Sequence, residues 1–232
     1  MREQGTGKYR YEIKYVCSDL QMLQMEEKIS VILARDPHVG GNGFYTIRSL
    51  YFDDYYNSAF YEKEDGNNPR EKYRLRYYNN DKSRIHLEIK KKSGAKIQKE
   101  SSPVTEKEAE AMAEGQWTEI AGSSSRVVQK FFLNGMTRIF RPKIIVEYDR
   151  VPYICREGNV RITFDKNIRS SSQVEEFWKE DLATRPVMPS GQHLLEVKFD
   201  EFLPDYIYNT LQMEHMVQTA FSKYYLCRKY TI

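Results

Sequence analysis

The sequence Arg10-Tyr11-Glu12-Ile13-Lys14 alternates charged and apolar residues, which is typical of a β-strand. Because successive side chains of a strand point to opposite faces, Arg10, Glu12 and Lys14 would lie on one face. The same alternation recurs in five further stretches, which contain Lys72/Arg74/Arg76, His86/Glu88/Lys90, Lys143/Ile145/Glu147/Asp149, Arg161/Asp165 and Glu196/Lys198. Each of these strands is therefore predicted to carry a ribbon of charges of both signs.

Two architectures are compatible with these ribbons. If all of them point inward, the protein is a barrel with a wet, charged lumen that suits a multiply charged anion and its metal ion. If they point outward, they form the solvent face of an ordinary soluble sheet. Solvent faces usually mix Thr, Ser, Gln and Lys, whereas these ribbons consist almost entirely of Arg, Lys, Glu and Asp. The composition weakens the second explanation, and the pattern by itself leaves both open.

Charges of both signs have a chemical use inside a lumen. Basic side chains repel one another there unless carboxylates lie between them, and carboxylates also bind hard divalent cations through oxygen. The residues predicted to point inward include more Lys and Arg than Asp and Glu. Such an excess would match a triphosphate, and arginine adds bidentate contacts to phosphate oxygens.

The remaining elements follow from periodicity and turn residues. Strands are predicted at residues 9–16, 44–52, 70–79, 84–92, 95–104, 138–154, 159–168 and 193–201, which gives about eight strands, mostly antiparallel. Helices are predicted after a Ser18 cap up to Asp36, and at 55–63, 105–114, 123–132, 204–215 and 221–228. Residues 169–173 and 185–192 are predicted to be loops.

Composition and missing motifs exclude several classes of protein. A net charge of +3 over 232 residues is too small to indicate nucleic-acid binding by itself. Three widely spaced cysteines support neither a disulfide framework nor a zinc site, and no apolar run is long enough to span a bilayer. Phosphate-loop, dinucleotide-binding, nucleophile-elbow and HExxH motifs are absent. We therefore expect a cytoplasmic protein.

Seven runs of the sequence, taken in order, resemble the VTC domain: RYEIKY (10–15), SLYFD (49–53), KYRLRYY (72–78), HLEIK (86–90), VRITFD (160–165), LLEVK (194–198) and FSKY (221–224). This domain is the polyphosphate polymerase module of the vacuolar transporter chaperone family, and it belongs to the triphosphate tunnel metalloenzymes, related to CYTH-type proteins. The resemblance implies an α+β fold in which a closed antiparallel β-barrel of about eight strands has a charged lumen and flanking helices. Residues 1–8 would be a disordered tail and 9–232 the tunnel domain.

The resemblance also implies the residues of a site. Six would act on the phosphates during catalysis: Lys14, Arg74, Arg76, Lys90, Arg161 and Lys223. Five would bind substrate: Lys96, Lys99, Arg150, Lys198 and Ser222. Glu196 would bind the metal ion, Mn²⁺ or Mg²⁺, with Glu12, Glu88 and Glu147 as supporting acids; an ion pair with a neighbouring Lys or Arg is the alternative role of these three.

The implied activity is a phosphotransferase reaction that moves the γ-phosphoryl group of ATP onto a growing polyphosphate chain. Such transfer needs positioning and charge neutralisation, and the terminal phosphate of the chain is already charged, so no general base is required. The wider superfamily begins with Glu-x-Glu-x-Lys, whereas this chain has Arg10-x-Glu12-x-Lys14. The loss of the first Glu weakens a hydrolytic two-metal arrangement and favours the polymerase.

Two alternatives stay open at this point. A triphosphatase that hydrolyses inorganic triphosphate or a nucleoside triphosphate would use almost the same residues. A non-catalytic module that binds polyphosphate or nucleotide would leave Glu196 without a catalytic role. Nucleic-acid binding is not expected, because acidic residues lie between the basic ones. The sequence shows neither the regulatory SPX domain nor the membrane helices of the eukaryotic complex, and it leaves a membrane partner open.

Overall fold

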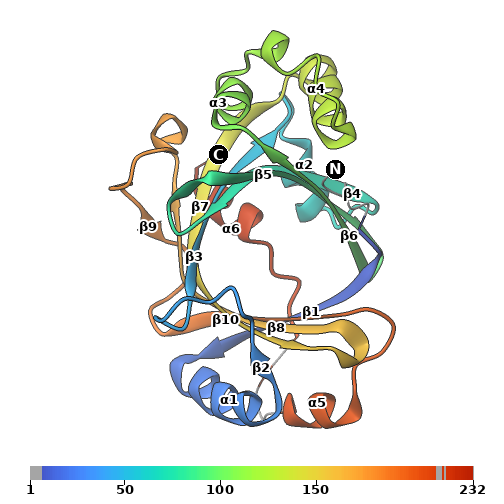
Figure 1. The fold of residues 1–232 in the computed structure, drawn as a ribbon, viewed down its shortest axis with the longest axis vertical. Helices are drawn as coiled ribbons and strands as arrows, with labels where there is room; N and C mark the ends of the chain where they lie inside the picture. Colours follow the sequence, from blue (N-terminus) through green and yellow to red (C-terminus); the bar gives the residue numbers. More distant parts are fainter. Residues whose placement is uncertain (1–6, 213–215, 217, 232) are drawn as a thin grey trace.

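Eight antiparallel strands close into a barrel in the computed structural model, which describes residues 7–212, 216 and 218–231. The strands are β1 (Arg10–Ser18), β3 (Tyr45–Asp53), β4 (Arg70–Tyr78), β5 (Asp81–Ser93), β6 (Lys96–Val104), β7 (Arg141–Cys155), β8 (Val160–Ser171) and β10 (Gln192–Phe199). They are ordered β7-β3-β4-β5-β6-β1-β10-β8, and pairing of β7 with β8 closes the ring (Figure 1). The predicted α+β fold with a closed barrel is confirmed.

Short elements and helices complete the chain. The two-residue strands β2 (Ala34–Arg35) and β9 (Arg185–Pro186) pair with β7 and β8, outside the ring. The helices are α1 (Asp19–Ile32), α2 (Ser58–Glu64), α3 (Glu106–Glu114), α4 (Arg126–Arg138), α5 (Asp205–Thr210) and α6 (Lys223–Lys229), with 3₁₀ turns at Trp117–Glu119, Glu157–Asn159 and Val174–Glu176. In the described part of the chain, no helix is long and apolar enough to cross a membrane.

Helices cover the barrel on two outer sides, and one helix lies inside it (Figure 1). On one side, α3 and α4 pack on the outer faces of β3, β4 and β5 through residues such as Met112 and Phe131. On the opposite side, α1 and α5 pack on β8 and β10, where Ile29 and Ile207 join the core. Inside the ring, Tyr224 and Cys227 of α6 pack on the apolar inner faces of β3 and β7. The helix α6 thus fills part of the lumen.

Helix starts follow the capping chemistry of the sequence. Thr105 accepts a hydrogen bond from the Glu108 amide while the Glu108 side chain accepts one from the Thr105 amide, so the predicted capping box is present. Ser18 and Gln21 form the same arrangement at the start of α1. At α6, the Ser222 hydroxyl accepts a hydrogen bond from the Tyr225 amide. Local polar side chains therefore fix where these three helices begin.

The structure corrects several predicted boundaries. The β8 strand continues through Ser171, into the predicted loop 169–173, because it pairs there with both β7 and the unpredicted β9. The helix expected at 123–132 runs from Arg126 to Arg138. The helix expected at 204–215 is described only as α5, and residues 213–215 lie outside the described part. Residues 1–6 of the predicted tail also lie outside it, and the single domain 9–232 stays a prediction.

Candidate functional site

The part of the lumen that α6 leaves open is a cavity of about 140 Å³ with a strongly basic wall. Eleven Lys and Arg side chains line it, namely Lys14, Lys63, Arg70, Lys72, Arg74, Arg76, Lys90, Lys92, Arg150, Lys198 and Lys223. Two carboxylates, Glu12 and Glu196, belong to the same lining. The two-residue period of strands produces this wall: in β4, Arg74 and Arg76 point inward while Tyr73 and Leu75 join the outer core.

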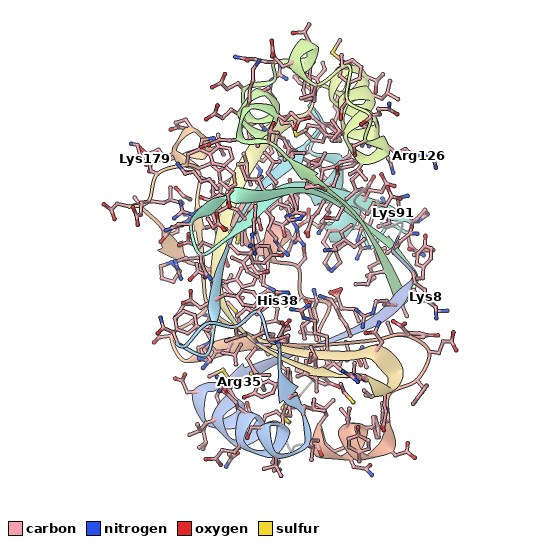
Figure 2. All side chains as sticks on the ribbon, in the orientation of Figure 1. Lys8, Arg35, His38, Lys91, Arg126 and Lys179 are labelled. Carbon is pink, nitrogen blue, oxygen red and sulfur yellow. The ribbon has the colours of Figure 1, made fainter. Side chains whose placement is uncertain are left out.

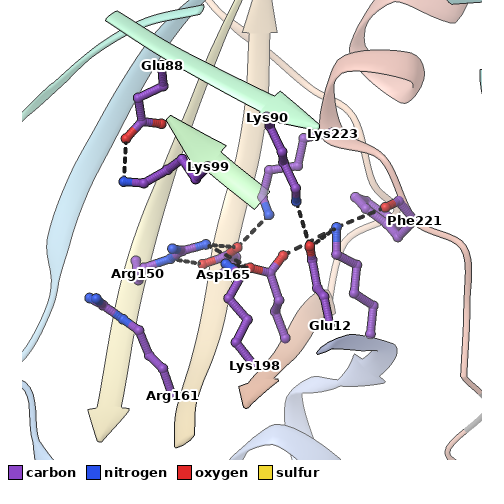
Figure 3. A network of polar contacts seen from close by, with 12 residues as sticks. Glu12, Glu88, Lys90, Lys99, Arg150, Arg161, Asp165, Lys198, Phe221 and Lys223 are labelled. Carbon is purple, nitrogen blue, oxygen red and sulfur yellow. Dashed lines mark hydrogen bonds and ion pairs between the residues drawn. The ribbon is translucent and has the colours of Figure 1, made fainter. Parts of the chain in front are cut away.

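Glu12 and Glu196 share three lysines in the centre of the cavity. The register of β1 and β10 sets Lys14 opposite Glu196 and Glu12 opposite Lys198. The Lys14 ammonium lies 3.0 Å from Glu12 Oε1 and 3.3 Å from Glu196 Oε2. Lys90 donates to Glu12 at 2.7 and 2.5 Å, and Lys198 pairs with Glu196 (Figure 3). Each carboxylate therefore lies between cations, as a mixed-sign lumen requires.

A second cluster joins the barrel wall to α6. Arg150 of β7 donates to both oxygens of Asp165, from Nε at 2.6 Å and from Nη2 at 2.7 Å. Lys223, the first residue of α6, lies 2.5 Å from Asp165 Oδ2 (Figure 3). The next residue, Tyr224, donates its hydroxyl to Asp53 at 2.5 Å, and Asp53 also accepts the amides of Ala59 and Phe60 in α2. These bonds fix Lys223 in the cavity wall.

The third cluster is built on Glu88 of β5. Arg74 donates to Glu88 Oε2 from Nε at 2.8 Å and from Nη2 at 2.6 Å, and Lys99 donates to Oε1 at 2.9 Å. The Arg76 guanidinium lies 3.5 Å from the same carboxylate. Arg74 also donates to the Tyr51 hydroxyl at 2.7 Å. Glu88 thus orients two arginines from behind, because it is buried and is not part of the lining itself.

Four lining residues form an unpaired cation cluster at one end of the cavity. Lys63, Arg70, Lys72 and Lys92 make no ion pair with any carboxylate of the described residues. Lys72 donates instead to the Ser222 hydroxyl at 2.7 Å. Burial, together with the charges of Lys90, Lys14 and Arg70, holds the pKa of Lys72 well below its usual value. An anion that enters this end would relieve that repulsion.

The charges of the central residues follow from their neighbours. Burial raises the pKa of Glu12, but Lys14, Lys90 and Lys198 outweigh burial and lower it to about 2. Lys198 and Lys14 likewise hold the pKa of the buried Glu196 well below its usual value, so both carboxylates are ionised. Burial and Lys14 lower the pKa of Lys90 to about 8, although Glu12 opposes this shift. Lys90 can therefore change its charge near neutral pH.

Eleven of the fifteen residues predicted for the site meet in or directly behind the cavity. They are Lys14, Arg74, Arg76, Lys90, Lys223, Arg150, Lys198, Ser222, Glu196 and Glu12 in the lining, and Glu88 behind it. Lys99 reaches the cluster through Glu88, but it is half exposed and lies outside the lining.

Three predicted residues are not brought to the cavity. Lys96 lies on the outer face, where its ammonium sits 5.0 Å from the centre of the Tyr11 ring. Glu147 also lies on the outer face and pairs with Arg48 and Arg169, because Tyr148 and Arg150 are the residues of β7 that point inward. Arg161 is held away by Asp36, at 2.7 Å, and by the Tyr45 hydroxyl, at 2.9 Å. In Figure 3, Arg161 accordingly stands apart from the network.

Sequence reasoning missed the unpaired cation cluster as part of the site. Alternation placed Lys72 in one ribbon with Arg74 and Arg76, but Lys72 was not assigned to the site. Arg70 shares this inward face of β4, and Lys92 shares that of β5 with Lys90, so alternation could have found these two as well. Lys63 comes from α2, and its position depends on how this helix packs against the barrel. No strand pattern could have indicated it.

Metal-binding capacity is limited to the two central carboxylates. The described residues contain no group of three or more His, Cys, Asp or Glu side chains that could hold a metal ion. Glu12 and Glu196 both approach the Lys14 ammonium, so their oxygens converge on one small region of the cavity. Two carboxylates fit a hard cation that takes its other oxygen ligands from phosphates and water.

Comparisons with known proteins agree with this geometry. The family model of the VTC domain matches residues 9–232. No curated protein matches the chain. Among solved structures, a candidate adenylyl cyclase from Hippeastrum, described as having a dominant triphosphatase activity, is 14% identical, covers 95% of each chain and has a TM-score of 0.57. A candidate adenylate cyclase from Bacillus halodurans is also 14% identical, covers 90% of this chain and 88% of its own, and has a TM-score of 0.51. These two likenesses show a shared fold.

Proposed function

The chain belongs to the VTC domain family, and from this premise we propose that it is a metal-dependent polyphosphate polymerase. It would transfer the γ-phosphoryl group of ATP to the end of a polyphosphate chain inside the basic tunnel. One observation carries this proposal above the others: eleven cations and only two carboxylates line one continuous cavity. Such a wall suits a long polyanion, and the unpaired cation cluster extends it beyond the residues around Glu12 and Glu196.

The arginines would position the phosphates. Glu88 and Asp165 hold Arg74 and Arg150 from behind, so the remaining N–H groups of both guanidiniums are oriented before substrate arrives. Preorganised donors of this kind stabilise charge that develops in the transition state, and arginine can contact two phosphate oxygens at once. Arg76, which donates to the Ser49 hydroxyl at 3.1 Å and to the Tyr148 hydroxyl at 3.1 Å, would act in the same way.

The lysines would neutralise charge along the chain. Lys14, Lys90 and Lys198 surround the two central carboxylates, and Lys223 pairs with Asp165. A bound phosphate would raise the pKa of Lys72 back towards its usual value, because the anion favours the protonated form. Ser222 holds the Lys72 ammonium near the cavity in the meantime.

Glu196 and Glu12 would hold Mn²⁺ or Mg²⁺ together with substrate phosphates. Their converging oxygens fit a hard cation, and Lys14 would have to move from its position between them. The metal ion, when bound, would neutralise phosphate charge and polarise the phosphoryl group. The protein's own part is to keep both carboxylates ionised, which the surrounding lysines achieve.

The ion pairing of the carboxylates around the cavity favours transfer of the phosphoryl group to phosphate over transfer to water. Among the described residues, every carboxylate in or behind the cavity forms an ion pair with Lys or Arg. None of these carboxylates is therefore free to act as a general base. Arg10, at the place of the superfamily's first Glu, pairs with Asp200 at 2.8 Å and donates to the Asn159 carbonyl, outside the lining. A polyphosphate end carries its own charge and needs no base.

A triphosphatase is the second candidate. The Hippeastrum protein of the same fold, which is described as having a dominant triphosphatase activity, favours it. In this reading the same arginines and lysines would hold the triphosphate, and water would be the acceptor. The unpaired cation cluster would then have no polyphosphate chain to bind.

One incubation separates these candidates. Purified protein is mixed with ATP and Mn²⁺, and ADP, free phosphate and long-chain polyphosphate are measured in the same sample. The polymerase predicts ADP and polyphosphate with little free phosphate. ADP with an equal amount of free phosphate would instead establish the triphosphatase, and tight binding of triphosphate without turnover would indicate a non-catalytic binding module.

A further inference from the structure

A second hollow adjoins the tunnel at the end that carries the unpaired cation cluster. Its volume is about 470 Å³, which is within the range of small-molecule pockets. It lies between α2, the first residues of β4, the last residues of β5 and the end of α4. Arg70 and Lys92 line both this side pocket and the tunnel, so the two spaces meet at these residues. Lys91, which also lines the side pocket, is labelled in Figure 2 and shows the reader where the pocket lies.

Most charged groups of the side pocket already have partners. Asp53 accepts the Tyr224 hydroxyl and two amides, Glu71 pairs with Lys130, and Arg138 pairs with Asp54. Glu62 differs from them, because it makes no hydrogen bond and no ion pair with any residue that the structure describes. Burial raises the pKa of Glu62, and the charges of Asp53 and Asp54 add to this shift, although Arg138 and Arg70 oppose it. A single half-buried carboxylate thus faces the pocket beside Arg70 and Lys92, which form no ion pair with any described carboxylate.

This combination of groups suits a ligand that has hydroxyls at one end and phosphate at the other. A carboxylate accepts hydrogen bonds from a pair of ribose hydroxyls, as it does in dinucleotide-binding proteins, whereas it repels a bare polyphosphate. The rings of Tyr9, Tyr73 and Phe140 provide an apolar wall, on which a planar base can pack. Arg70 and Lys92 lie where the phosphates of such a ligand would leave the pocket.

We propose that the side pocket binds the nucleoside of the phosphoryl donor, with Glu62 accepting hydrogen bonds from the ribose hydroxyls while the phosphates pass Arg70 and Lys92 into the tunnel. This inference rests on the proposed function, since it names the donor as a nucleotide and assigns its base and sugar a place. It makes Glu62 a specificity-determining residue, which distinguishes ATP from inorganic triphosphate without touching the phosphates.

The test compares three ligands on the wild-type chain and on Glu62→Gln by calorimetry at fixed Mn²⁺. The ligands are inorganic triphosphate, ATP and 2′,3′-dideoxy-ATP. For the wild type we expect ATP to bind about tenfold more tightly than dideoxy-ATP, the usual effect of losing hydrogen bonds to a charged group. Glu62→Gln should reduce this ratio severalfold and leave the affinity for inorganic triphosphate within about twofold of wild type.

Two matched variants complete the experiment. Glu64→Gln removes a neighbouring charge on the same helix, where Glu64 accepts the Tyr225 hydroxyl, and should leave the ratio of ATP to dideoxy-ATP unchanged. Tyr9→Ala removes an exposed ring of the pocket and should weaken ATP and dideoxy-ATP equally, but not inorganic triphosphate. Equal binding of ATP and dideoxy-ATP by the wild type, with tight triphosphate binding, would overturn the nucleoside site and leave the tunnel assignment intact. No binding of any triphosphate would overturn both.

Discussion

Two clusters of buried charge lie on opposite faces of the barrel wall, and they differ in how completely their members are paired. On the outer face, Arg48 donates to Glu147 at 2.5 Å, to the Tyr77 hydroxyl at 3.1 Å and to the carbonyls of Phe177 and Lys179. On the inner face, cations outnumber carboxylates, and Lys72 has only a hydroxyl as its partner.

The difference separates a structural ion cluster from a ligand site. Both clusters are buried, and both contain arginines with close carboxylate partners, so burial and ion pairing alone do not identify a binding site. Arg48 has its bonding groups satisfied by the protein and joins the segment around Val174–Glu176 to the wall. The inner cluster has cationic capacity that no protein group uses. We therefore expect mutations in the outer cluster to change stability and mutations in the inner cluster to change binding.

The largest effect is expected from breaking the outer cluster. Arg48→Ala leaves Glu147 with Arg169 as its remaining partner and removes the Arg48 donor from the carbonyls of Lys179 and Glu180. The free energy of unfolding should therefore fall by about 3 kcal/mol. Urea unfolding measures the loss, with Arg156→Ala, an exposed arginine, as the control. The affinity of the folded protein for triphosphate should stay unchanged. A normal unfolding curve for Arg48→Ala would contradict the structural role.

The next effect concerns catalysis on the inner face. Arg74→Ala should lower the rate of ADP formation roughly hundredfold, the usual loss when one preorganised donor is removed from a developing charge. The fold should survive, because Glu88 keeps Arg76 and Lys99 as partners. The rate is measured together with a thermal melt, and Arg84→Ala on the exposed end of β5 is the matched control. Near-normal turnover with a cooperative melt would remove Arg74 from the site.

A third change should make stability and binding move in opposite directions. Lys72→Met removes a buried cation that has no carboxylate partner, so the free protein should become more stable by about 1 kcal/mol. The affinity for triphosphate should fall about tenfold, because one phosphate contact is lost. Calorimetry and urea unfolding report the two quantities, with Lys28→Met, on the exposed face of α1, for comparison. A destabilised Lys72→Met protein would mean that the two clusters do not differ as described.

The smallest effect is the pH dependence of binding. The pKa of Lys90 is about 8 in the folded protein, below its ordinary value of 10.5, so Lys90 loses its proton first in the fold. Between pH 8 and 10.5, Lys90 binds more protons in the unfolded chain than in the folded one. The contribution of Lys90 to the free energy of unfolding therefore increases as pH rises through this interval. Triphosphate affinity should fall over the same interval, by at most about tenfold per pH unit for one lysine.

Calorimetry between pH 7.5 and 9.5 measures this fall in affinity. Lys90→Arg keeps the charge at all these values and should flatten the profile. If the wild type and Lys90→Arg showed the same dependence of affinity on pH, the group that titrates would not be Lys90.

The inward face of a strand could be predicted where the alternation of residues within that strand is enough to determine it. Alternation alone placed Glu12 and Lys14 together, and the resemblance to the VTC domain then gave the residues their roles. Alternation failed for β7, because its inner face is set by α6, which packs on Ile144 and Val146, and its outer face by Arg48. Both partners come from distant parts of the chain, so no local pattern in β7 could reveal which face is internal.

The site residues that were misplaced have similar explanations. Lys96 and Lys99 are three positions apart on one strand, so they must point to opposite faces, and only Lys99 points towards Glu88. Arg161 has the inward orientation that alternation predicts, but Asp36, from the loop after β2, engages it. Lys63 and Glu62 reach the tunnel and the side pocket from a helix, which strand alternation does not describe.

The position of α6 inside the ring also determines the order in which the protein can be assembled. Every strand of the barrel precedes Lys223 in the sequence, yet Tyr224 and Cys227 cover the inner faces of β3 and β7. A chain emerging from the ribosome therefore cannot fill this part of its barrel until α6 has been synthesised. The basic cavity, whose wall includes Ser222 and Lys223, is therefore complete only after α6 has been synthesised and has packed inside the ring.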